Sequence, residues 1–306
     1  MNVLSLFDGI SCGQVALERA GIKVDNYYAS EIEESAIAIT QYNYPNTIQL
    51  GDVTLLTEEK IKGLGSIDLL IGGSPCTDLS NYKYYMQDST GLEGKSSRLF
   101  YEYLRIKSIV KPKYFLLENV ASMKEKWKNV MSELMGCEPI LINSALVCAA
   151  ERKRLYWTNI PNIGQPKDKG IVLRDIVLDS SLVEDKYWYN RPFIYNGNDK
   201  KVQCTLELNG SHRQAKEVYN LSGKCNTLMC DGNGGNIQKK VYQDGKCRKL
   251  TPLEYERLQT LPDNYTLKGL YNGIEKIISN SKRYNACGNG WTVDIIAYIF
   301  SHLGGM

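Results

Sequence analysis

Near the start of the chain, Asn2-Val3-Leu4-Ser5-Leu6 runs directly into Phe7-Asp8-Gly9-Ile10-Ser11-Cys12-Gly13. The first segment is short and apolar, as expected for a strand. The second is a loop whose glycines let the backbone approach a ligand. Open α/β sheets bind ligands at this carboxyl edge of their strands. A tight strand-to-helix turn without a ligand has the same appearance, and the spacing differs from the dinucleotide-binding Gly-x-Gly-x-x-Gly.

The first 160 residues repeat this alternation of strand and helix. The pattern predicts βαβ units, a mainly parallel Rossmann-like sheet and helices on both of its faces, which is the α/β class. The helices end at usual stop signals, such as Gly21 and Pro45. The predicted strands are 2–6, 26–30, 48–50, 67–72, 114–118, 138–142 and 155–159, and the predicted helices are 13–20, 34–44 and 99–110.

The composition changes at about Pro161. Glycine, asparagine, lysine and tyrosine become frequent, strand fragments are predicted at 171–173, 202–208 and 226–229, and 231–236 is glycine-rich. Thr251-Pro252 with Glu254 has the pattern of a capping box with proline at the first helical position, so a helix is expected there and a last one at 293–303. We therefore divide the chain into a catalytic domain (1–164), a smaller loop-rich module (165–247) and a C-terminal return (248–306).

Composition and charge permit several classes of partner. The 306 residues are 43% hydrophobic, apolar runs are short, and no leader peptide is evident, so an intracellular protein without membrane segments is expected. Residues 165–247 hold 13 Lys/Arg against 10 Asp/Glu, a surplus equal to the net charge of +3. Such a surplus allows a polyanionic partner without arguing for one.

The nine cysteines form an odd set without a Cys-x-x-Cys, and the only histidines are His212 and His302. A disulfide framework or a zinc site is therefore not expected. Any one cysteine is more often a small buried hydrophobe than a reactive thiol. A reactive role for Cys76 needs support from its surroundings.

Two acids end the next two predicted strands. Glu31 is placed to bind both hydroxyls of a ribose, and Asp52 to accept a hydrogen bond from an exocyclic amine. Either acid alone is more often a helix cap. The glycine loop, Glu31 and Asp52 at successive strand ends together favour an adenosine ligand.

Further reactive groups follow at the same edge. After the fourth strand, Gly73-Ser74-Pro75-Cys76 fixes the backbone so that Cys76 projects from the edge, although its thiol reacts only if its pKa falls. Glu118 ends the fifth strand, where a cap or an ion pair is the alternative. Arg152 and Arg154, two residues apart, are expected on one face of a strand, with ordinary surface basicity as the alternative.

In this order the blocks resemble the DNA cytosine-5 methyltransferase family over nearly the whole chain. Residues 7–13 resemble its cofactor loop, 73–76 its Pro-Cys nucleophile block, 118–120 its Glu-Asn-Val block and 152–154 its Arg-x-Arg block. Residues 248–262 and 288–293 match two later blocks. The amino-acid sequences of these motifs are similar to those of the vertebrate de novo catalytic domain, whereas the lack of accessory domains is typical of microbial members.

The resemblance implies a class I methyltransferase fold with a target-recognition domain in the loop-rich module. It implies S-adenosyl-L-methionine as cofactor, S-adenosyl-L-homocysteine as product, and no metal. It makes Cys76 the nucleophile, Glu118 and Arg154 the groups at N3 and O2 of cytosine, and Arg152 a supporting catalytic residue. The cofactor would contact Phe7, Asp8, Gly9, Ile10, Ser11, Cys12, Gly13, Glu31, Ile32, Asp52, Val53, Asn289, Gly290 and Trp291. The DNA would contact Ser80, His212, Arg213, Gln214, Thr227, Gly234 and Gly235.

The implied partner is double-stranded DNA, bound by a monomer in the cytoplasm, beside the nucleoid, of a bacterium or phage-infected cell. The target base would flip into the pocket, and residues 81–97 would close behind it. A tRNA cytosine-5 methyltransferase shares the blocks, but its Cys-Phe-Thr tripeptide is missing here. A catalytically silent DNA-binding relative would lose the nucleophile block or the cofactor loop. A dehydrogenase-like protein would leave Cys76, Glu118 and Arg154 without a shared purpose.

Overall fold

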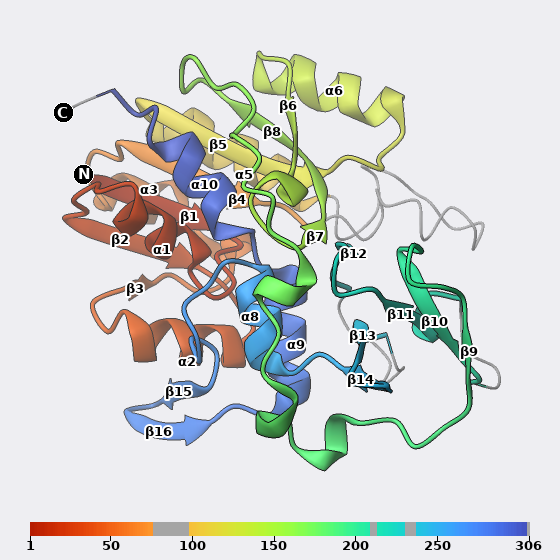
Figure 1. The fold of residues 1–306 in the computed structure, drawn as a ribbon. Helices are drawn as coiled ribbons and strands as arrows, with labels where there is room; N and C mark the ends of the chain where they lie inside the picture. Colours follow the sequence, from red (N-terminus) through yellow and green to blue (C-terminus); the bar gives the residue numbers. More distant parts are fainter. Residues whose placement is uncertain (76–97, 209–212, 230–236, 305–306) are drawn as a thin grey trace. The chain divides into compact units, whose positions relative to one another are not determined.

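The computed structural model describes residues 1–75, 98–208, 213–229 and 237–304 (Figure 1). The chain forms two compact units. The first unit comprises Met1–Ile142, Lys153–Gln165 and Ile296–Met306, and the second unit comprises Asn143–Arg152 and Pro166–Ile295. The functional boundaries expected at residues 164 and 247 stay predictions.

The first unit is built on a seven-stranded sheet with the order β3-β2-β1-β4-β5-β8-β6. Pairing is parallel from β3 to β5, and β8 runs antiparallel to β5. The strands are β1 Asn2–Leu6, β2 Asn26–Ser30, β3 Ile48–Gln49, β4 Leu69–Gly73, β5 Tyr114–Val120, β6 Ile140–Asn143 and β8 Lys153–Thr158. The predicted α/β class and mainly parallel sheet are confirmed. The chain moves outward in opposite directions from β1 and β4, so the carboxyl ends of these neighbours form a topological switch point.

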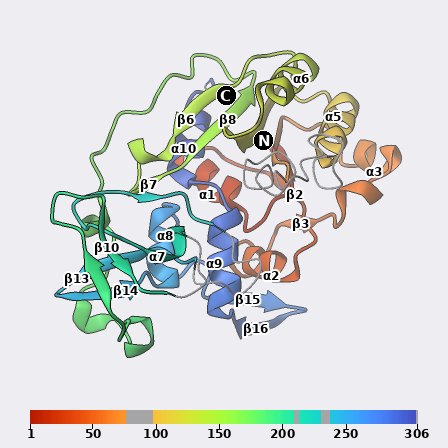
Figure 2. The same cartoon turned by 90° about the vertical axis from the view of Figure 1, so that its right-hand side faces the viewer.

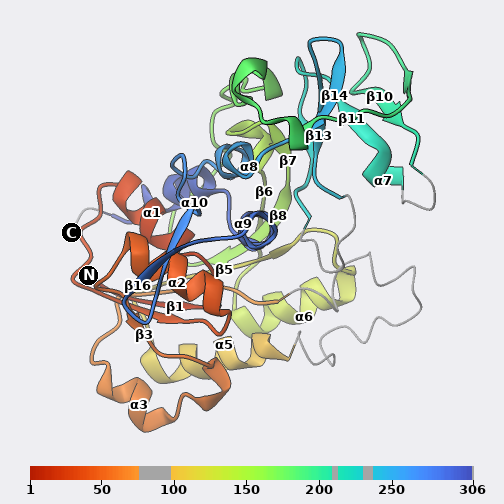
Figure 3. The same ribbon diagram turned by 90° about the horizontal axis from the view of Figure 1, so that it is seen from below.

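Helices cover both faces of this sheet (Figure 3). The helices α1 (Cys12–Arg19) and α2 (Glu34–Asn43) lie on one face. On the other lie α3 (Glu58–Gly63), α5 (Leu99–Val110) and α6 (Glu125–Met135), of which only α5 was predicted. The main core joins these three helices to the strands through buried residues that include Leu4, Leu6, Leu70, Leu117, Phe100, Tyr103, Ile61 and Met131.

Gly72 allows α5 to pack closely beneath the switch point. A Cβ atom at Gly72 would lie 3.0 Å from the Leu6 carbonyl oxygen and 3.1 Å from the Tyr103 ring. The Tyr103 hydroxyl donates a hydrogen bond of 3.3 Å to the Leu70 carbonyl. A larger residue at position 72 would therefore displace either β1 or α5.

The second unit contains a five-stranded sheet with the order β14-β13-β11-β10-β9. Strands β10, β13 and β14 of this sheet are labelled in Figure 2. Its core is small, with Cys204, Leu206, Val218 and Cys247 among its buried members. The strands are β9 Phe193–Tyr195, β10 Val202–Leu206, β11 Glu217–Tyr219, β13 Lys240–Gln243 and β14 Lys246–Lys249. Two-stranded sheets pair β7 (Ala150–Glu151) with β12 (Cys225–Asn226), and β15 (Lys268–Tyr271) with β16 (Ile274–Ile277).

The described residues of the second unit form the α-helices α7 (Arg213–Lys216), α8 (Pro252–Leu258) and α9 (Asn280–Asn289), and α10 (Val293–Phe300) runs from it into the first unit. The predicted capping box is confirmed, because the Thr251 side chain accepts from the Glu254 N–H and the Glu254 carboxylate accepts from the Thr251 N–H. The predicted strand at 171–173 is wrong, since a 3-10 helix (Leu173–Asp175) begins there. The backbone N–H groups of Leu173 and Arg174 donate to the carbonyls of Gly223 and Leu221 instead of to a strand partner.

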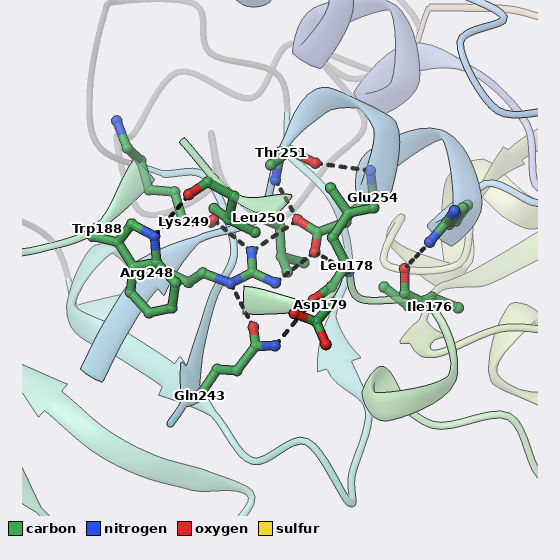
Figure 4. A network of polar contacts seen from close by, with 12 residues as sticks. Ile176, Leu178, Asp179, Trp188, Gln243, Arg248, Lys249, Leu250, Thr251 and Glu254 are labelled. Atoms are coloured by element: carbon green, nitrogen blue, oxygen red, sulfur yellow. Dashed lines mark hydrogen bonds and ion pairs between the residues drawn. The ribbon is translucent and has the colours of Figure 1, made fainter. Parts of the chain in front are cut away.

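A buried ion pair holds α8 in the second unit (Figure 4). Arg248 and Glu254 are both fully buried and form two hydrogen bonds of 2.9 and 2.6 Å. Glu254 also accepts the N–H groups of Thr251 and Leu178, and Gln243 accepts from the Arg248 Nε. Because each charged group has several partners, the pair is satisfied despite its burial.

Candidate active site

The loop after β1 is a tight turn formed by three residues with left-handed backbone. Their φ angles are 58° at Phe7, 59° at Gly9 and 55° at Ser11. Residues other than glycine rarely adopt this conformation, so the surroundings must hold Phe7 and Ser11 in it. Ser11 is fully buried and accepts a hydrogen bond of 3.2 Å from the Thr40 hydroxyl. The predicted cofactor loop is therefore a preformed turn at the carboxyl end of β1.

The carboxyl group of Asp8 lies inside this turn. It accepts hydrogen bonds from the Ser11 hydroxyl and, at 2.7 Å, from the Tyr27 hydroxyl. Burial raises the pKa of Asp8 to about 6, and these hydrogen bonds partly oppose that rise. Asp8 therefore ties the turn to β2 through side chains.

Glu31 ties the same turn to the end of β2 through the backbone. Its Oε2 accepts the Gly9 N–H at 2.8 Å, and its Oε1 accepts the N–H groups of Ile32 and Glu33 at 2.8 and 2.9 Å. The N-cap residue of α2 is Glu33, so the alternative role of Glu31 as a helix cap is wrong. A carboxylate has about four acceptor sites, so capacity is left for ribose hydroxyls.

Asp52 caps a helix, which is the alternative to a ligand-binding role given above for this residue. Its Oδ1 accepts from the Thr54 N–H at 2.9 Å and the Thr54 hydroxyl at 2.8 Å, which starts the 3-10 helix Val53–Leu55. Both bonds use Oδ1, so the second oxygen can still accept from an amine. Capping and ligand binding are therefore compatible at this position.

The other predicted cofactor residues differ in exposure. The side chains of Ile10, Cys12 and Val53 are at most 5% exposed, so these residues can offer a ligand only backbone atoms. Ile32, in contrast, is 73% exposed directly after Glu31. An exposed isoleucine at this position is suited to cover an apolar ring face of a ligand.

At the end of β4, Ser74 is fixed by Asn119 of β5. The Asn119 side-chain amide donates to the Ser74 hydroxyl at 3.1 Å and to its carbonyl at 3.3 Å, and both residues are buried. Its own oxygen accepts the Val120 N–H at 2.8 Å. Asn119 therefore anchors the segment that leads into Pro75. Sequence analysis does not single out Asn119, which directly follows Glu118 in the chain. Because successive side chains of a strand point to opposite faces, Asn119 faces away from Glu118.

Glu118 and Arg154 form an ion pair on the opposite face of β5. In the antiparallel register Glu118 lies opposite Tyr156 and Val120 opposite Arg154, so the two charged residues are diagonal neighbours. Arg154 Nε lies 2.7 Å from Glu118 Oε1, and the side chains are only 13% and 10% exposed. The structure thus brings together two of the predicted catalytic residues in a largely desolvated place.

Arg152 does not share a strand face with Arg154. Strand β7 ends at Glu151 and β8 begins at Lys153, so Arg152 lies between two strands of different sheets. The expectation of two arginines on one strand face is wrong, because the chain passes between sheets at this residue. The Arg152 guanidinium is buried and donates to the carbonyls of Gly288 and Gly290 at 3.2 and 3.1 Å.

The predicted DNA-contacting residues that the structure describes lie in the second unit. The Thr227 hydroxyl donates to the Glu151 carbonyl at 2.7 Å, which joins the chain after β12 to β7. Arg213 and Gln214 lie on α7, and the Arg213 side chain is 93% exposed. A cavity of about 400 Å³ beside them is lined by Asn196, Val202, Thr205, Arg213, Lys216 and Glu217.

Several predicted site residues lie outside the described residues. They are Cys76, Ser80, the 81–97 segment, His212, Gly234 and Gly235. Within the described ranges, no three His, Cys, Asp or Glu side chains gather closely enough to hold a metal ion. Nor does that part of the chain contain a helix with the length and apolarity needed to span a membrane.

Comparisons with known proteins agree with this architecture. A family model described as C-5 cytosine-specific DNA methylase matches residues 1–137 and 145–305. The type II methyltransferase M.HhaI of Haemophilus parahaemolyticus is 27% identical over 328 residues, covering 99% of this chain and 94% of the relative. The rice DNA (cytosine-5)-methyltransferase DRM1A is 43% identical over 120 residues, covering 36% of this chain and 25% of the relative.

Two solved structures share the fold at low sequence identity. The S. pombe Dnmt2 methyltransferase superposes with a TM-score of 0.68 at 17% identity, covering all of both chains. The Entamoeba histolytica methyltransferase EhMeth superposes with a TM-score of 0.70 at 16% identity, covering 100% of this chain and 99% of the other. The described part of the chain therefore shares the fold of known methyltransferases.

Proposed function

The chain belongs to the C-5 cytosine-specific DNA methylase family, and from this premise we propose that it methylates carbon-5 of a cytosine flipped out of double-stranded DNA. The observation that carries the proposal is the largely desolvated Glu118–Arg154 pair on β5 and β8. On the other face of β5, Asn119 anchors Ser74, two residues before Cys76. The protein is proposed to act as a monomer in the cytoplasm, beside the nucleoid.

The cofactor is proposed to be S-adenosyl-L-methionine, which supplies an electrophilic methyl group and leaves as S-adenosyl-L-homocysteine. The residues present fit its adenosine part. Glu31 has acceptor capacity for the ribose, Ile32 is exposed for the adenine ring, and Asp52 has an oxygen for the exocyclic amine. Residues 7–13 offer a preformed turn, and Asn289, Gly290 and Trp291 are proposed as further cofactor contacts.

The chemistry starts at Cys76. Its thiolate adds to carbon-6 of the cytosine, and the displaced electron pair makes carbon-5 nucleophilic. Glu118 is proposed to bind the ring at N3 and Arg154 at O2, where they would stabilise the charge that develops on addition. Once carbon-5 carries the methyl group, loss of its proton and cleavage of the bond between sulfur and carbon-6 release the product. Residues 81–97 are proposed to close over the flipped base.

Most of the proposed DNA contacts belong to the second unit. Arg213 and Lys216 line the 400 Å³ cavity together with Glu217, which pairs with Arg213 at 3.5 Å. The two cations are proposed to meet a polyanion, and an arginine can read guanine in the major groove. Ser80, His212, Gln214, Thr227, Gly234 and Gly235 remain proposed DNA contacts. Replacing Arg213 should therefore change the methylated sequence.

The experiment that tests the function uses tritiated S-adenosyl-L-methionine. We expect label in duplex DNA and none in tRNA, and we expect Cys76→Ser to abolish turnover. Label in tRNA alone would favour the tRNA methyltransferase alternative, and an absence of label in both would favour the silent DNA-binding alternative.

Covalent chemistry is tested separately with duplex DNA that contains 5-fluorocytosine. Fluorine at carbon-5 blocks the elimination step, so the protein should stay attached to the DNA through Cys76. An adduct that persists in Cys76→Ala would show that another residue attacks the base.

A further inference from the structure

We propose that Arg152 is a positioning residue for the cofactor, acting with Gln259 through the backbone of residues 287–293, rather than a catalytic residue at the cytosine. This inference rests on the proposed function, because it takes Asn289, Gly290 and Trp291 as cofactor contacts. We call Arg152, Gln259 and the backbone of residues 287–293 that they bond the clamp, and all of these residues lie in the second unit.

The clamp consists of two side chains that donate to adjacent carbonyls. Arg152 donates to Gly288 and Gly290, and the Gln259 amide donates to Cys287 and, at 2.9 Å, to Gly290. The Gly290 carbonyl therefore accepts from both side chains. This atom lies directly between Asn289 and Trp291 in the chain.

Gln259 also fixes the far side of the segment. Its side-chain oxygen accepts the Thr292 hydroxyl at 2.9 Å, and its backbone carbonyl accepts the Val293 N–H at 2.9 Å. Arg152, Gln259 and Thr292 are each 5% exposed or less. Asn289, in contrast, is exposed and Trp291 half-buried, and the bonds from Arg152 and Gln259 reach the backbone carbonyls rather than these two side chains.

The position of Arg152 in the chain explains why the pattern Arg-x-Arg carries two different roles. Its own N–H donates to the Asn143 side chain at 3.0 Å, and its carbonyl accepts from the Ser144 N–H at 2.9 Å, so its backbone is fixed before β8 begins. Arg154, two residues later, turns to Glu118. Within three residues, the chain therefore carries Arg152, which bonds the backbone at Gly288 and Gly290, and Arg154, which pairs with the proposed base-binding residue Glu118.

The test separates cofactor binding from base chemistry. For Arg152→Ala we expect the Kd of S-adenosyl-L-homocysteine, measured by calorimetry without DNA, to rise about tenfold or more, because two charge-assisted hydrogen bonds are lost. At saturating S-adenosyl-L-methionine the rate of trapping on 5-fluorocytosine DNA should stay within about threefold of wild type, a smaller effect than loss of one transition-state donor would have.

Arg154→Ala is the matched control, with the opposite pattern expected: an unchanged cofactor Kd and loss of trapping. Arg152→Lys, which keeps one donor, should restore part of the affinity, and Gln259→Glu should weaken it, since a carboxylate cannot donate to the two carbonyls. If Arg152→Ala folds poorly, Arg152→Lys and Gln259→Glu carry the test.

An unchanged cofactor Kd in Arg152→Ala together with lost trapping would overturn the proposal and return Arg152 to the base. Equal loss of active protein in every assay, with Kd unchanged, would overturn it as well. Wild-type protein that binds the cofactor but neither methylates nor traps DNA would contradict the proposed function while leaving the clamp testable by binding.

Discussion

At the scale of single residues, the site depends on side chains that fix the backbone beside the reactive groups. Asn119→Ala removes the amide that holds Ser74, so we expect the trapping rate on 5-fluorocytosine DNA to fall by about tenfold or more and the protein to lose about 1–3 kcal/mol of stability. Asn159→Ala is the control, because Asn159 also bonds two backbone groups, those of Phe115 and Lys113, at the other end of β5. Trapping in Asn119→Ala that equals trapping in Asn159→Ala would contradict the role.

Asp8 makes the stability of the cofactor turn depend on pH. Its pKa is raised from 3.8 to about 6 in the folded protein, chiefly by burial. Between these values the folded state binds more protons than the unfolded state, so the free energy of unfolding falls as the pH rises. From pH 5 to pH 7 this loss is about 1 kcal/mol.

Urea denaturation of the ligand-free protein at both pH values measures this effect. Asp8→Asn cannot titrate, so its stability should change less between pH 5 and pH 7 than that of wild type. Because all other titratable groups are shared, the difference between the two proteins isolates Asp8. Identical pH dependence in both would refute the assignment.

At the scale of elements, α8 is held by its polar residues rather than by an apolar face alone. Glu254→Ala should cost about 3–5 kcal/mol, because Arg248 is left buried without its partner. Thr251→Ala removes only the cap and should cost about 1 kcal/mol. Thermal denaturation of both variants should preserve this order, whereas Lys186→Ala, which breaks the exposed pair with Glu184, should cost less than about 1 kcal/mol.

The elements visible in the sequence are those with a local cause. Strands β1 and β2 and helix α5 were predicted with their observed bounds, because apolar runs and stop signals mark them. Helix α9 was not predicted: its sequence, Asn280–Asn289, is mostly polar, and its buried members include Arg283, which pairs with Glu256. Such a helix is stabilised by partners distant in the chain, and periodicity cannot reveal them.

The same distinction applies to the candidate site. Glu118 and Arg154 could be selected because both lie at predicted strand positions and resemble family blocks, but their ion pair depends on an antiparallel register between β5 and β8. Arg152 has different partners from Arg154 because the chain passes from one sheet to another at this residue, and no local sequence pattern indicates that change. The sequence could therefore propose the residues, whereas tertiary contacts assign them to partners.

At the scale of the whole molecule, the residues proposed to contact the cofactor come from both units. Residues 7–13, Glu31 and Asp52 belong to the first unit, and residues 289–291 belong to the second. A ligand bound by both sets reduces local opening in both. We expect S-adenosyl-L-homocysteine to slow amide hydrogen exchange at 7–13 and also at 287–293. The β15–β16 hairpin, which contains none of the proposed contacts, should exchange at an unchanged rate and serves as the internal reference.

The distribution of protection distinguishes the alternatives. Protection limited to 7–13 and 31–33 would mean that the first unit binds the cofactor alone, and would remove Asn289, Gly290 and Trp291 from the site. In Arg152→Ala, protection at 287–293 should be lost first, because Gly288 and Gly290 have lost a donor while Gly9 keeps its bond to Glu31. Equal loss of protection in both units of Arg152→Ala would indicate weaker binding overall. Repeating the exchange at a saturating ligand concentration distinguishes the two cases, because a loss caused by weaker binding disappears and a local loss at 287–293 does not.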